Sequence, residues 1–465
     1  MSTAYAFAAH GLFPAEDGAL LFDADRGSLF SVDAGTRDAV ERWRGRGALA
    51  LDRLPAPDRQ ALEALEGTGI LVPFPAPADR PRAAPDPAAV PLGTLVLEVA
   101  QACNLRCTYC YAEGGTYGGP PRLLEPARAR RAARFLLAHS GDREAVTLVL
   151  FGGEPLLNWP AVRAAVEEAR RAADRVGKGL TLSLTTNATR LTADRARFLA
   201  EHRVGVTVSL DGPPEIHDAN RPFPDGRGSY GEVLRGLGHL LRGPRAPVAA
   251  RVTLEPSQWA RAGEVFDHLV ALGFHEVGLA PASPVQRRLL PSKDQEDALL
   301  AEFAGLAARF EAAVGAGRVL PFSNLLDLLA RIHVGQTKTI SCGAGLGYVG
   351  LDASGRFFPC HRLAGQDAFQ IGDLDRGLDA DRVRRCLEAL TGSRGKRCRP
   401  CWARGLCAGG CHYENYLREQ LLGLAPGGSC RFIRRWLQTG IETYARVRAG
   451  TGGWLLDRLG ERASC

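Results

Sequence analysis

The sequence predicts an α/β protein whose central part is built from six strand–helix units, as either an open doubly wound sheet or a barrel. Six apolar strand candidates alternate with helical stretches between residues 91 and 316, which is typical of a parallel sheet with helical crossovers. The cysteines fall into two groups, with three at positions 103–110 and nine after residue 341. A short unit of mixed strands and helices precedes both groups. We therefore expect an N-terminal module, a central α/β part and a cysteine-rich C-terminal part.

The composition limits the class of protein. At 465 residues, 45% hydrophobic and 23% charged, the chain matches an ordinary globular protein of several domains. No apolar run approaches the length of a membrane span, and no signal peptide precedes the first module, so we expect a cytoplasmic protein without a membrane partner. The net charge of +7 comes from arginines spread over many helices. Because they form no basic and aromatic pattern, a nucleic-acid partner is not expected.

Residues 1–75 are predicted to form a small module. Two short apolar runs, 19–22 and 28–32, are joined by a turn sequence rich in Asp and Gly, which predicts a hairpin. Helices are expected at about 34–43 and 57–65, followed by a strand at 70–74. This order of elements resembles a winged-helix module. The Pro/Ala-rich segment 76–90 then reads as a linker.

Residues 91–330 are predicted to form the central α/β part, with helices such as Trp159–Val176 and Thr192–Glu201 between its strands. The strand candidates are 94–100, 145–150, 179–185, 205–210, 247–253 and 275–280. In parallel sheets of this kind the functional site lies beyond the carboxyl ends of the strands. Polar motifs occur at these ends: Cys103–Cys110, Phe151-Gly-Gly-Glu-Pro155, Thr185-Thr-Asn187, Ser209-Leu-Asp-Gly212 and Thr253. Each motif alone is weak, but five at one rim predict a functional site there.

The first cysteine motif is Cys103-x3-Cys107-x2-Cys110. Three thiolates can bind three irons of a cubane cluster and leave the fourth iron open. An open metal position is what a catalytic site keeps and a structural site closes. The motif by itself does not decide between such a cluster, a structural zinc loop and free thiols.

Residues 331–465 carry the second group of cysteines. A strand at 346–352 and a turn at 353–355 lead to Cys360, and a closing helix is expected at 432–447. A zinc ribbon usually pairs two Cys-x2-Cys turns, and the second pair is absent. Cys386 and Cys465 are interpreted as structural or incidental. The remaining seven cysteines are one short of two four-cysteine sites: Cys342, Cys360, Cys398, Cys401, Cys407, Cys411 and Cys430.

These motifs together resemble the radical S-adenosylmethionine enzymes that carry a SPASM domain. The resemblance spans about residues 91–430 and includes the later Cys-x2-Cys-x5-Cys-x3-Cys run. It implies a partial (βα)6 TIM-like barrel with a [4Fe–4S] cluster on Cys103, Cys107 and Cys110. It also implies that S-adenosylmethionine binds the open iron and is reductively cleaved to a 5′-deoxyadenosyl radical, which abstracts hydrogen from the substrate. The contacts to this cofactor are expected from Tyr109, Gly152, Gly153, Glu154, Asn187, Ser209, Asp211 and Arg221.

The same resemblance implies two auxiliary [4Fe–4S] clusters, and so three clusters in all. One would be bound by Cys398, Cys401, Cys407 and Cys430, and the other by Cys342, Cys360 and Cys411. Members with full cysteine ligation have a further ligand about six residues after the first cysteine, where this chain has Tyr348. We therefore predict an open iron that binds a substrate thiolate. Sulfatase maturases carry an acidic base where this chain has His361, so formylglycine formation is less favoured.

The layout most resembles maturases that form thioether crosslinks in ribosomally made peptides or in the small subunit of quinohemoprotein amine dehydrogenase. The N-terminal module is similar to domains that bind a leader peptide as an added strand. The prediction is a radical SAM peptide or protein maturase, served by a flavodoxin or ferredoxin type of electron donor. One alternative keeps the radical but ends in carbon–carbon or aryl crosslinking, epimerisation or formylglycine-type oxidation. Another is a non-enzymatic iron–sulfur electron carrier or peptide-binding scaffold.

Overall fold

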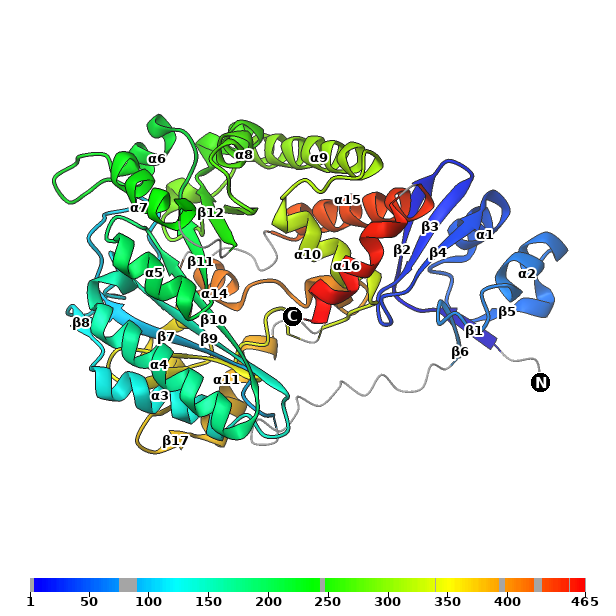
Figure 1. Ribbon diagram of the computed structural model, residues 1–465. Helices are drawn as coiled ribbons and strands as arrows, with labels where there is room; N and C mark the ends of the chain where they lie inside the picture. The colour runs from blue at the N-terminus through cyan, green and yellow to red at the C-terminus, as the bar shows by residue number, and fades with distance from the viewer. Residues whose placement is uncertain are drawn as a thin grey trace.

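The computed structural model describes residues 4–74, 90–242, 247–338, 340–392, 398–421, 429–450 and 452–464. A large sheet covered by helices forms one end of the molecule, and a small N-terminal part lies beside the C-terminal helices at the other end (Figure 1). The predicted linker 76–90 falls almost entirely outside the described residues, as does Cys465. None of the described helices is long and apolar enough to cross a membrane.

Six parallel strands form the centre of the sheet, as predicted. In spatial order they are β13 (Glu276–Pro281), β12 (Val248–Leu254), β11 (Val204–Ser209), β10 (Gly179–Thr186), β9 (Ala145–Gly152) and β7 (Thr94–Gln101). The short β8 (Arg122–Leu123) pairs with the end of β7. Among the described strands β13 stands at an edge, so the barrel is open. The predicted α/β class and partial barrel are confirmed.

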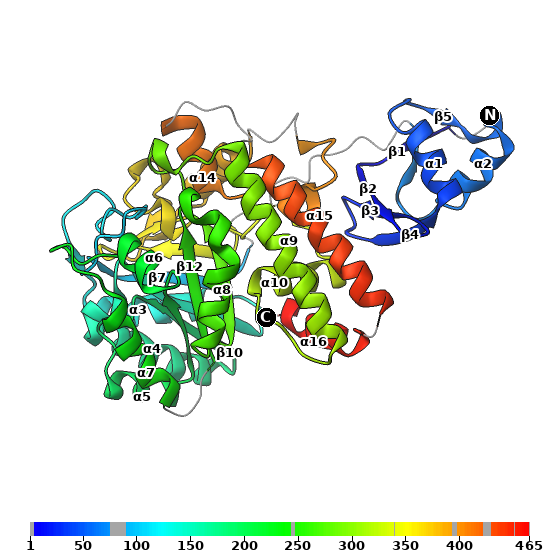
Figure 2. The same cartoon turned by 90° about the horizontal axis from the view of Figure 1, so that it is seen from above.

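Helices cover the outer face of these strands (Figures 1 and 2). Predicted helix 159–176 is confirmed with the same bounds, and predicted helix 192–201 begins one residue later because the Thr192 hydroxyl caps it, accepting from Arg195 N–H at 3.4 Å. The helices are α3 (Pro126–Ala138), α4 (Trp159–Val176), α5 (Ala193–Glu201), α6 (Pro214–Asn220), α7 (Tyr230–Arg242), α8 (Ala262–Ala271) and α9 (Lys293–Gly315). Single 3-10 turns lie at Pro155–Asn158, Pro256–Arg261 and Arg287–Leu289.

The C-terminal part continues the barrel sheet. β14 (Tyr348–Leu351) pairs in parallel with β7, and β15 (Arg356–Phe358), β16 (Gly372–Asp373) and β17 (Gly377–Leu378) follow in antiparallel order. The strand begins two residues later than predicted, because Gly345 and Gly347 adopt positive φ angles of 78° and 77°. Cys360 therefore closely follows a strand that belongs to the same sheet as the barrel.

Helices complete the C-terminal part. Predicted helix 432–447 is confirmed as part of α15, which packs along α9 (Figure 2). The sequence did not predict α9, α10 or α16. The helices are α10 (Ser323–His333), α11 (Ala380–Gly392), α13 (Arg404–Cys407), α14 (His412–Tyr416), α15 (Cys430–Ala449) and α16 (Gly453–Ser464), with 3-10 turns at His361–Leu363 and Asp367–Phe369 and a π-helical turn at Leu417–Leu421.

The N-terminal part contains two small antiparallel sheets. One has the order β5 (Leu49–Ala50), β1 (Ala4–Phe7) and β6 (Leu71–Pro73), and the other has β2 (His10–Ala15), β3 (Gly18–Asp23) and β4 (Leu29–Asp33). The predicted hairpin 19–32, both helices and the last strand are confirmed. The helices are α1 (Ala34–Trp43) and α2 (Ala56–Glu63), with a 3-10 turn at Leu51–Arg53 between them. A separate apolar cluster around Leu21, Val40, Leu62 and Ile70 forms the core of this part.

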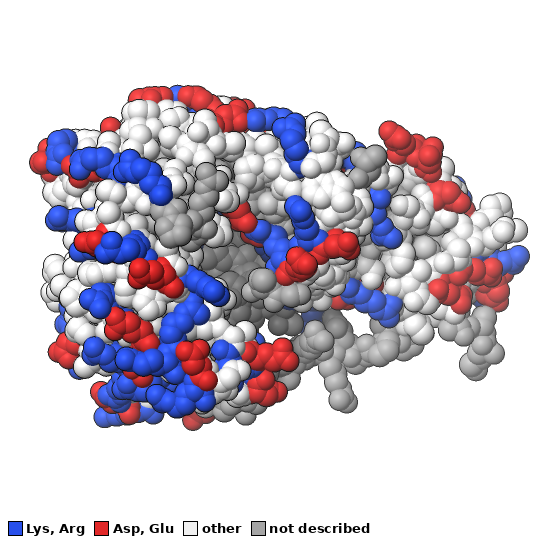
Figure 3. Space-filling model, viewed as in Figure 1, with Lys and Arg blue, Asp and Glu red and all other residues white. Residues whose placement is uncertain are grey.

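Arginine and lysine side chains gather over α3 and α4 on the face seen in Figure 3. Several of them are neutralised by ion pairs, such as Arg131 with Asp375 and Arg134 with Glu168. The exposed Arg131–Asp375 pair contributes little to stability. These arginines therefore lie on a solvated helical surface.

Candidate active site

The carboxyl ends of the parallel strands open into a cavity of about 630 Å³. Residues from the barrel rim line one side, and residues of the C-terminal part, including His361 and Arg362, line the other. Of the predicted site residues, the cavity brings together Cys103, Cys107, Tyr109, Cys110, Gly152, Gly153, Asn187, Ser209 and Arg221. Glu154 and Asp211 do not line it. Parallel pairing places these motifs at one rim because every strand ends there in the same direction.

The loop after β7 holds the first three cysteines. Backbone N–H groups donate to two of the sulfurs, from Leu105 to Cys103 Sγ and from Gly114 to Cys110 Sγ, both at 3.4 Å. Burial raises the pKa of Cys103 to about 12 and that of Cys107 to about 11. These thiols are therefore protonated at neutral pH, and metal binding must release their protons.

The donor set of this loop fits an iron–sulfur cluster. Three cysteine thiols face one cavity, and backbone amides supply the hydrogen bonds to sulfur that such clusters use. Among the described residues, no three His, Cys, Asp or Glu side chains are grouped so that they could hold a single metal ion.

The two glycines after β9 pack directly against the start of the cysteine loop. A Cβ atom at Gly152 would lie 2.3 Å from the Ala100 carbonyl oxygen, and one at Gly153 would lie 2.4 Å from that of Ala102. Gly152 also has φ of +135°, a conformation that side chains rarely adopt. The glycines therefore bring the backbone of β9 to the cavity wall beside Cys103.

Glu154 turns away from the cavity. Its Oε1 accepts from Leu156 N–H at 2.9 Å and from the Thr186 hydroxyl at 2.7 Å, and its Oε2 accepts from Asn187 N–H at 2.7 Å. Burial raises the pKa of this carboxyl, and the hydrogen bonds act in the opposite direction. The Glu154 carboxylate thus links β9 to the end of β10, and Phe151, Gly152 and Gly153 are the residues of this motif that line the cavity. The cofactor contact predicted for Glu154 stays a prediction.

Asp211 is also enclosed by protein. Arg221 donates to its two oxygens at 2.9 and 3.1 Å, Thr253 N–H donates at 2.9 Å, and the Tyr109 hydroxyl donates to Oδ2. Burial alone would raise the pKa of Asp211, but the charge and hydrogen bonds of Arg221 outweigh it and hold the pKa below its usual range. Asp211 thus fixes Arg221 and Tyr109, which do line the cavity, and its own predicted cofactor contact stays a prediction.

Asn187 and Ser209 occupy the rim between these motifs. The Asn187 amide donates to Asn104 Oδ1 at 3.1 Å and lies 3.9 Å from Cys103 Sγ. Ser209 is paired across the sheet with Arg251. These polar groups can contact a cofactor held beside the cysteine loop.

Arg251 and Arg362 are cavity residues that the sequence analysis missed. Arg251 stands two residues before Thr253, on the same face of β12, and its side chain makes no hydrogen bond or ion pair to another described residue. In the sequence, the only signal for Arg251 was the alternation of side chains along β12, which places it on the same face as Thr253. Arg362 follows Cys360 by two positions, but no motif distinguished it from the many other arginines.

The C-terminal cysteines form two groups in space. Burial raises the pKa of Cys407, and the nearby thiols of Cys430, Cys401 and Cys398 act in the same direction. Burial likewise raises the pKa of Cys360 to about 12, with added contributions from Cys411 and Cys342. These proximities match the two predicted ligand sets, whose clusters remain predictions.

Tyr348 lies at the place of the missing eighth cysteine. Its hydroxyl is 2.8 Å from His361 Nδ1, and that nitrogen is 3.8 Å from Cys360 Sγ. Burial lowers the pKa of His361 to about 3, so the imidazole is neutral. His361, which stands where sulfatase maturases carry an acidic base, is thus held by Tyr348 beside the predicted cluster.

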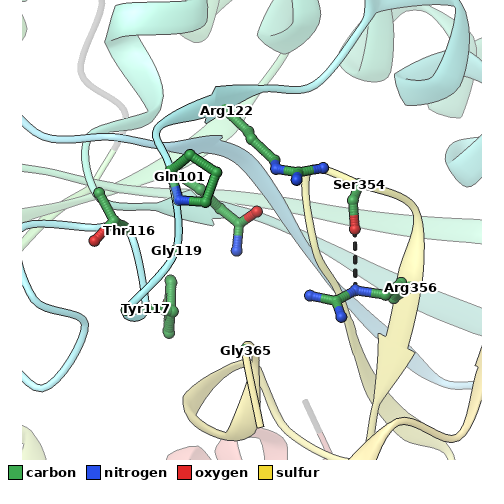
Figure 4. Close-up of a pocket in the computed structure, with 10 residues that line it drawn as sticks. Gln101, Thr116, Tyr117, Gly119, Arg122, Ser354, Arg356 and Gly365 are labelled. Atoms are coloured by element: carbon green, nitrogen blue, oxygen red, sulfur yellow. Dashed lines mark hydrogen bonds between the residues drawn. The ribbon is translucent and has the colours of Figure 1, made fainter. Parts of the chain in front are cut away.

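A second cavity of about 330 Å³ lies outside the predicted site (Figure 4). The segment after the first cysteine motif, with Tyr117 and Arg122, forms one wall, and the β14–β15 turn forms the other. Arg356 Nε donates to Ser354 Oγ at 3.1 Å across this turn. No predicted site residue lines this cavity.

Comparison with known proteins identifies the central part of the chain. Residues 97–243 match the model of the Radical SAM superfamily. The chain carries a radical SAM domain. The protein is therefore an enzyme that uses S-adenosylmethionine and a radical SAM iron–sulfur cluster, as the resemblance implied, and the non-enzymatic alternative is not supported.

Relatives of the radical SAM domain extend the likeness over most of the chain. The serine-type anaerobic sulfatase-maturating enzyme of Klebsiella aerogenes is 26% identical over 394 residues, 83% of this chain and 95% of the relative. The structure of native anSMEcpe with bound AdoMet and Cp18Cys peptide gives a TM-score of 0.62 at 18% identity, over 80% of this chain and 99% of that one. Streptococcus suis SuiB bound to S-adenosylmethionine gives 0.50 at 15% identity, over 89% and 97%. At these identities the structures establish the fold.

Proposed function

We propose that this enzyme is a radical SAM maturase that forms a thioether crosslink within a ribosomally made peptide or small protein. One observation carries the proposal: the first cysteine motif and the segment after Cys360 face the same cavity. A peptide in this cavity would lie between the predicted radical-generating cluster and the predicted auxiliary cluster.

The residues of the chain have distinct roles in this proposal. Cys103, Cys107 and Cys110 would hold the radical SAM cluster, and Gly152 and Gly153 would let S-adenosylmethionine approach the backbone of β9. When bound, the cluster and S-adenosylmethionine supply a 5′-deoxyadenosyl radical that takes a hydrogen atom from substrate. Asp211 holds Arg221 and Tyr109 in place on the cavity wall.

Two auxiliary clusters are part of the proposal. Cys398, Cys401, Cys407 and Cys430 would bind one, and Cys342, Cys360 and Cys411 would bind the other. The Tyr348 hydroxyl lies 2.8 Å from His361 Nδ1, so the residue at the position of the eighth cysteine contacts a histidine. This supports an iron left open for a substrate thiolate.

The proposed partners are a precursor peptide and an electron donor of flavodoxin or ferredoxin type. A peptide partner is supported by the Cp18Cys peptide bound to anSMEcpe. Among the described strands β4 pairs only with β3, so its other edge is available to a peptide strand. The N-terminal part would then hold the leader while the core of the peptide enters the cavity.

Formylglycine-type oxidation is the second candidate function. It is favoured by the 26% identity to a serine-type sulfatase-maturating enzyme across most of both chains. Against it stands His361, whose neutral imidazole is bound to Tyr348 at the position predicted for an acidic base. We rank crosslinking first for this reason.

Anaerobic reconstitution with iron, sulfide, S-adenosylmethionine and a low-potential reductant tests both candidates. The peptide to use is a cysteine-containing one encoded beside the gene. A thioether product lacks two hydrogens and one free thiol, whereas oxidation of serine removes two hydrogens and keeps every thiol. Tandem mass spectrometry then locates the bond. Failure of the reduced enzyme to form 5′-deoxyadenosine would contradict both functions.

A further inference from the structure

Arg362 lies between the two cysteine-bearing regions of the cavity. Its guanidinium is 4.8 Å from the ring centre of Tyr111 and 4.7 Å from that of Tyr413. Tyr111 directly follows Cys110, and Tyr413 is two residues after Cys411. One half-buried cation therefore contacts residues adjacent to both predicted cluster sites.

Arg362 also contacts two sulfurs of one predicted ligand set. Its backbone N–H donates to Cys360 Sγ at 3.4 Å, and its Nη1 donates to Cys411 Sγ at 3.4 Å. The guanidinium further donates to the Ser283 hydroxyl, and Nη1 lies 3.5 Å from Glu414 Oε1. These polar contacts fix the guanidinium against the sulfurs.

Hydrogen bonds to ligand sulfurs and nearby positive charge both favour the reduced, more negative state of an iron–sulfur cluster. Both act here through one half-buried side chain. The radical SAM sulfurs receive only backbone donors and the distant Asn187 amide among the described contacts. The charge of Arg362 is thus directed to one of the three predicted clusters.

We propose that Arg362 is a positioning residue that raises the reduction potential of the cluster bound by Cys342, Cys360 and Cys411 and joins its loop to the radical SAM loop. The inference rests on the proposed function, since it requires that auxiliary cluster. It assigns Arg362 to the redox environment of the site rather than to the leader or to S-adenosylmethionine.

Redox titration followed by electron paramagnetic resonance tests the inference on the full-length reconstituted protein. Arg362→Gln removes the charge and keeps a polar side chain, and Arg362→Lys keeps the charge without the planar stacking group. We expect a lower midpoint potential for one cluster in Arg362→Gln and a smaller shift in Arg362→Lys, with the other clusters unchanged. Arg382→Gln, at an exposed arginine paired with Asp379, is the matched control and should change none.

The outcomes separate the inference from the function on which it rests. Iron content equal to wild type with one lowered potential supports the role of Arg362, and equal iron with unchanged potentials overturns it. If Arg362→Gln loses iron, the comparison uses Arg362→Lys instead. Equal iron with one lowered potential then supports the role of Arg362, and equal iron with unchanged potentials overturns it. A wild-type protein that binds only one cluster would overturn the auxiliary clusters and this inference together, whereas three clusters with unchanged potentials would overturn the inference alone.

Discussion

Asp211 and Arg221 form an ion pair that is almost completely enclosed, with 0% and 9% of their side chains exposed. Asp211→Ala would leave the Arg221 charge buried without its partner, and such a change costs about 3–5 kcal/mol. Urea unfolding should show this loss, together with weakened binding of S-adenosylmethionine. The control is Asp194→Ala at an exposed pair, expected within about 0.5 kcal/mol of wild type. Equal stability of the two variants would contradict the structural role of Asp211.

Cysteine substitutions test the assignment of ligands one residue at a time. Cys107→Ala should lose one cluster's worth of iron and all formation of 5′-deoxyadenosine, because two thiolates cannot replace three. Cys386→Ala is the control: this buried cysteine lies in α11, packs in the main core and has no assigned ligand role. It should keep its iron and cost about 1 kcal/mol in unfolding free energy. Iron loss in Cys386→Ala would mean that the ligand sets are wrongly drawn.

At the residue scale, the sequence identifies which residues could take part in a site better than it identifies where their side chains point. The cysteines were recognisable from their spacing, and most of the predicted rim residues do line the cavity. Glu154 and Asp211 were also predicted as site residues, but hydrogen bonds from other protein groups occupy their carboxylates. Which partners a strand-end carboxylate finds depends on neighbouring strands. Arg362 was missed because its partners lie on three distant segments.

The β9 turn carries the next prediction, at the scale of elements. Gly153→Ala would push a methyl group against the Ala102 carbonyl, which precedes Cys103, so we expect reduced iron content and weaker binding of S-adenosylmethionine. The control is Gly305→Ala within α9, where no atom lies within 4 Å of the added methyl. Replacing a helical glycine in open space should stabilise by about 0.5–1 kcal/mol. Normal iron content in Gly153→Ala would show that the turn can shift without moving the cysteine loop.

The contact between α1 and α2 predicts a pH dependence. Asp58 accepts from Trp43 Nε1 at 2.8 Å and from Arg42 at 2.6 Å. The Trp43 hydrogen bond, aided by Arg42, lowers the pKa of Asp58 despite its burial. A lowered folded-state pKa adds stability above the unfolded value of about 3.9, and that stability is lost as pH falls through the folded value.

The measurement compares wild type with Asp58→Asn, which cannot ionise. Hydrogen exchange in α1 and α2 should be slower in wild type by a constant factor between pH 5 and 7, and we expect the difference to shrink below about pH 4. Trp43→Phe removes the main donor and should reduce the difference at every pH. If the difference in exchange rate between the two proteins stayed the same below about pH 4, ionised Asp58 could not be its source.

Elements with long apolar runs were predictable, and short ones were not. The six barrel strands came out within one or two residues because buried apolar residues mark each of them. β7 is a nearly continuous buried run, whereas β9, β10, β11 and β12 alternate buried with half-buried or exposed positions. β5, β16 and β17 have two residues each, too few to show any periodicity. The late start of β14 depends on positive φ angles at Gly345 and Gly347, which a glycine permits but does not require.

On the scale of the whole molecule, the N-terminal part meets the C-terminal part at Trp402. The indole lies 4.8 Å from the Phe13 ring and 6.4 Å from the Phe22 ring, and Arg404 pairs with Asp25 nearby. Leu20 and Phe22 of β3 belong to the main core, as does Phe13 of β2, while Leu21 between Leu20 and Phe22 belongs to the N-terminal core. β3 therefore has one face in each core. No sequence pattern could predict a contact between segments separated by most of the chain.

This contact links the proposed leader-binding part to a proposed cluster, because Trp402 directly follows Cys401. Trp402→Ala removes the aromatic pairs, each worth about 0.5–1.5 kcal/mol beyond buried area. We expect hydrogen exchange in β2 and β3 to speed up about tenfold, the equivalent of about 1.4 kcal/mol, and iron content to fall by part of one cluster. Trp402→Phe should restore both, and Trp454→Ala in α16 should change neither. Unchanged exchange in β2 and β3 would mean that other contacts hold the N-terminal part, so that leader binding and the auxiliary site are mechanically independent.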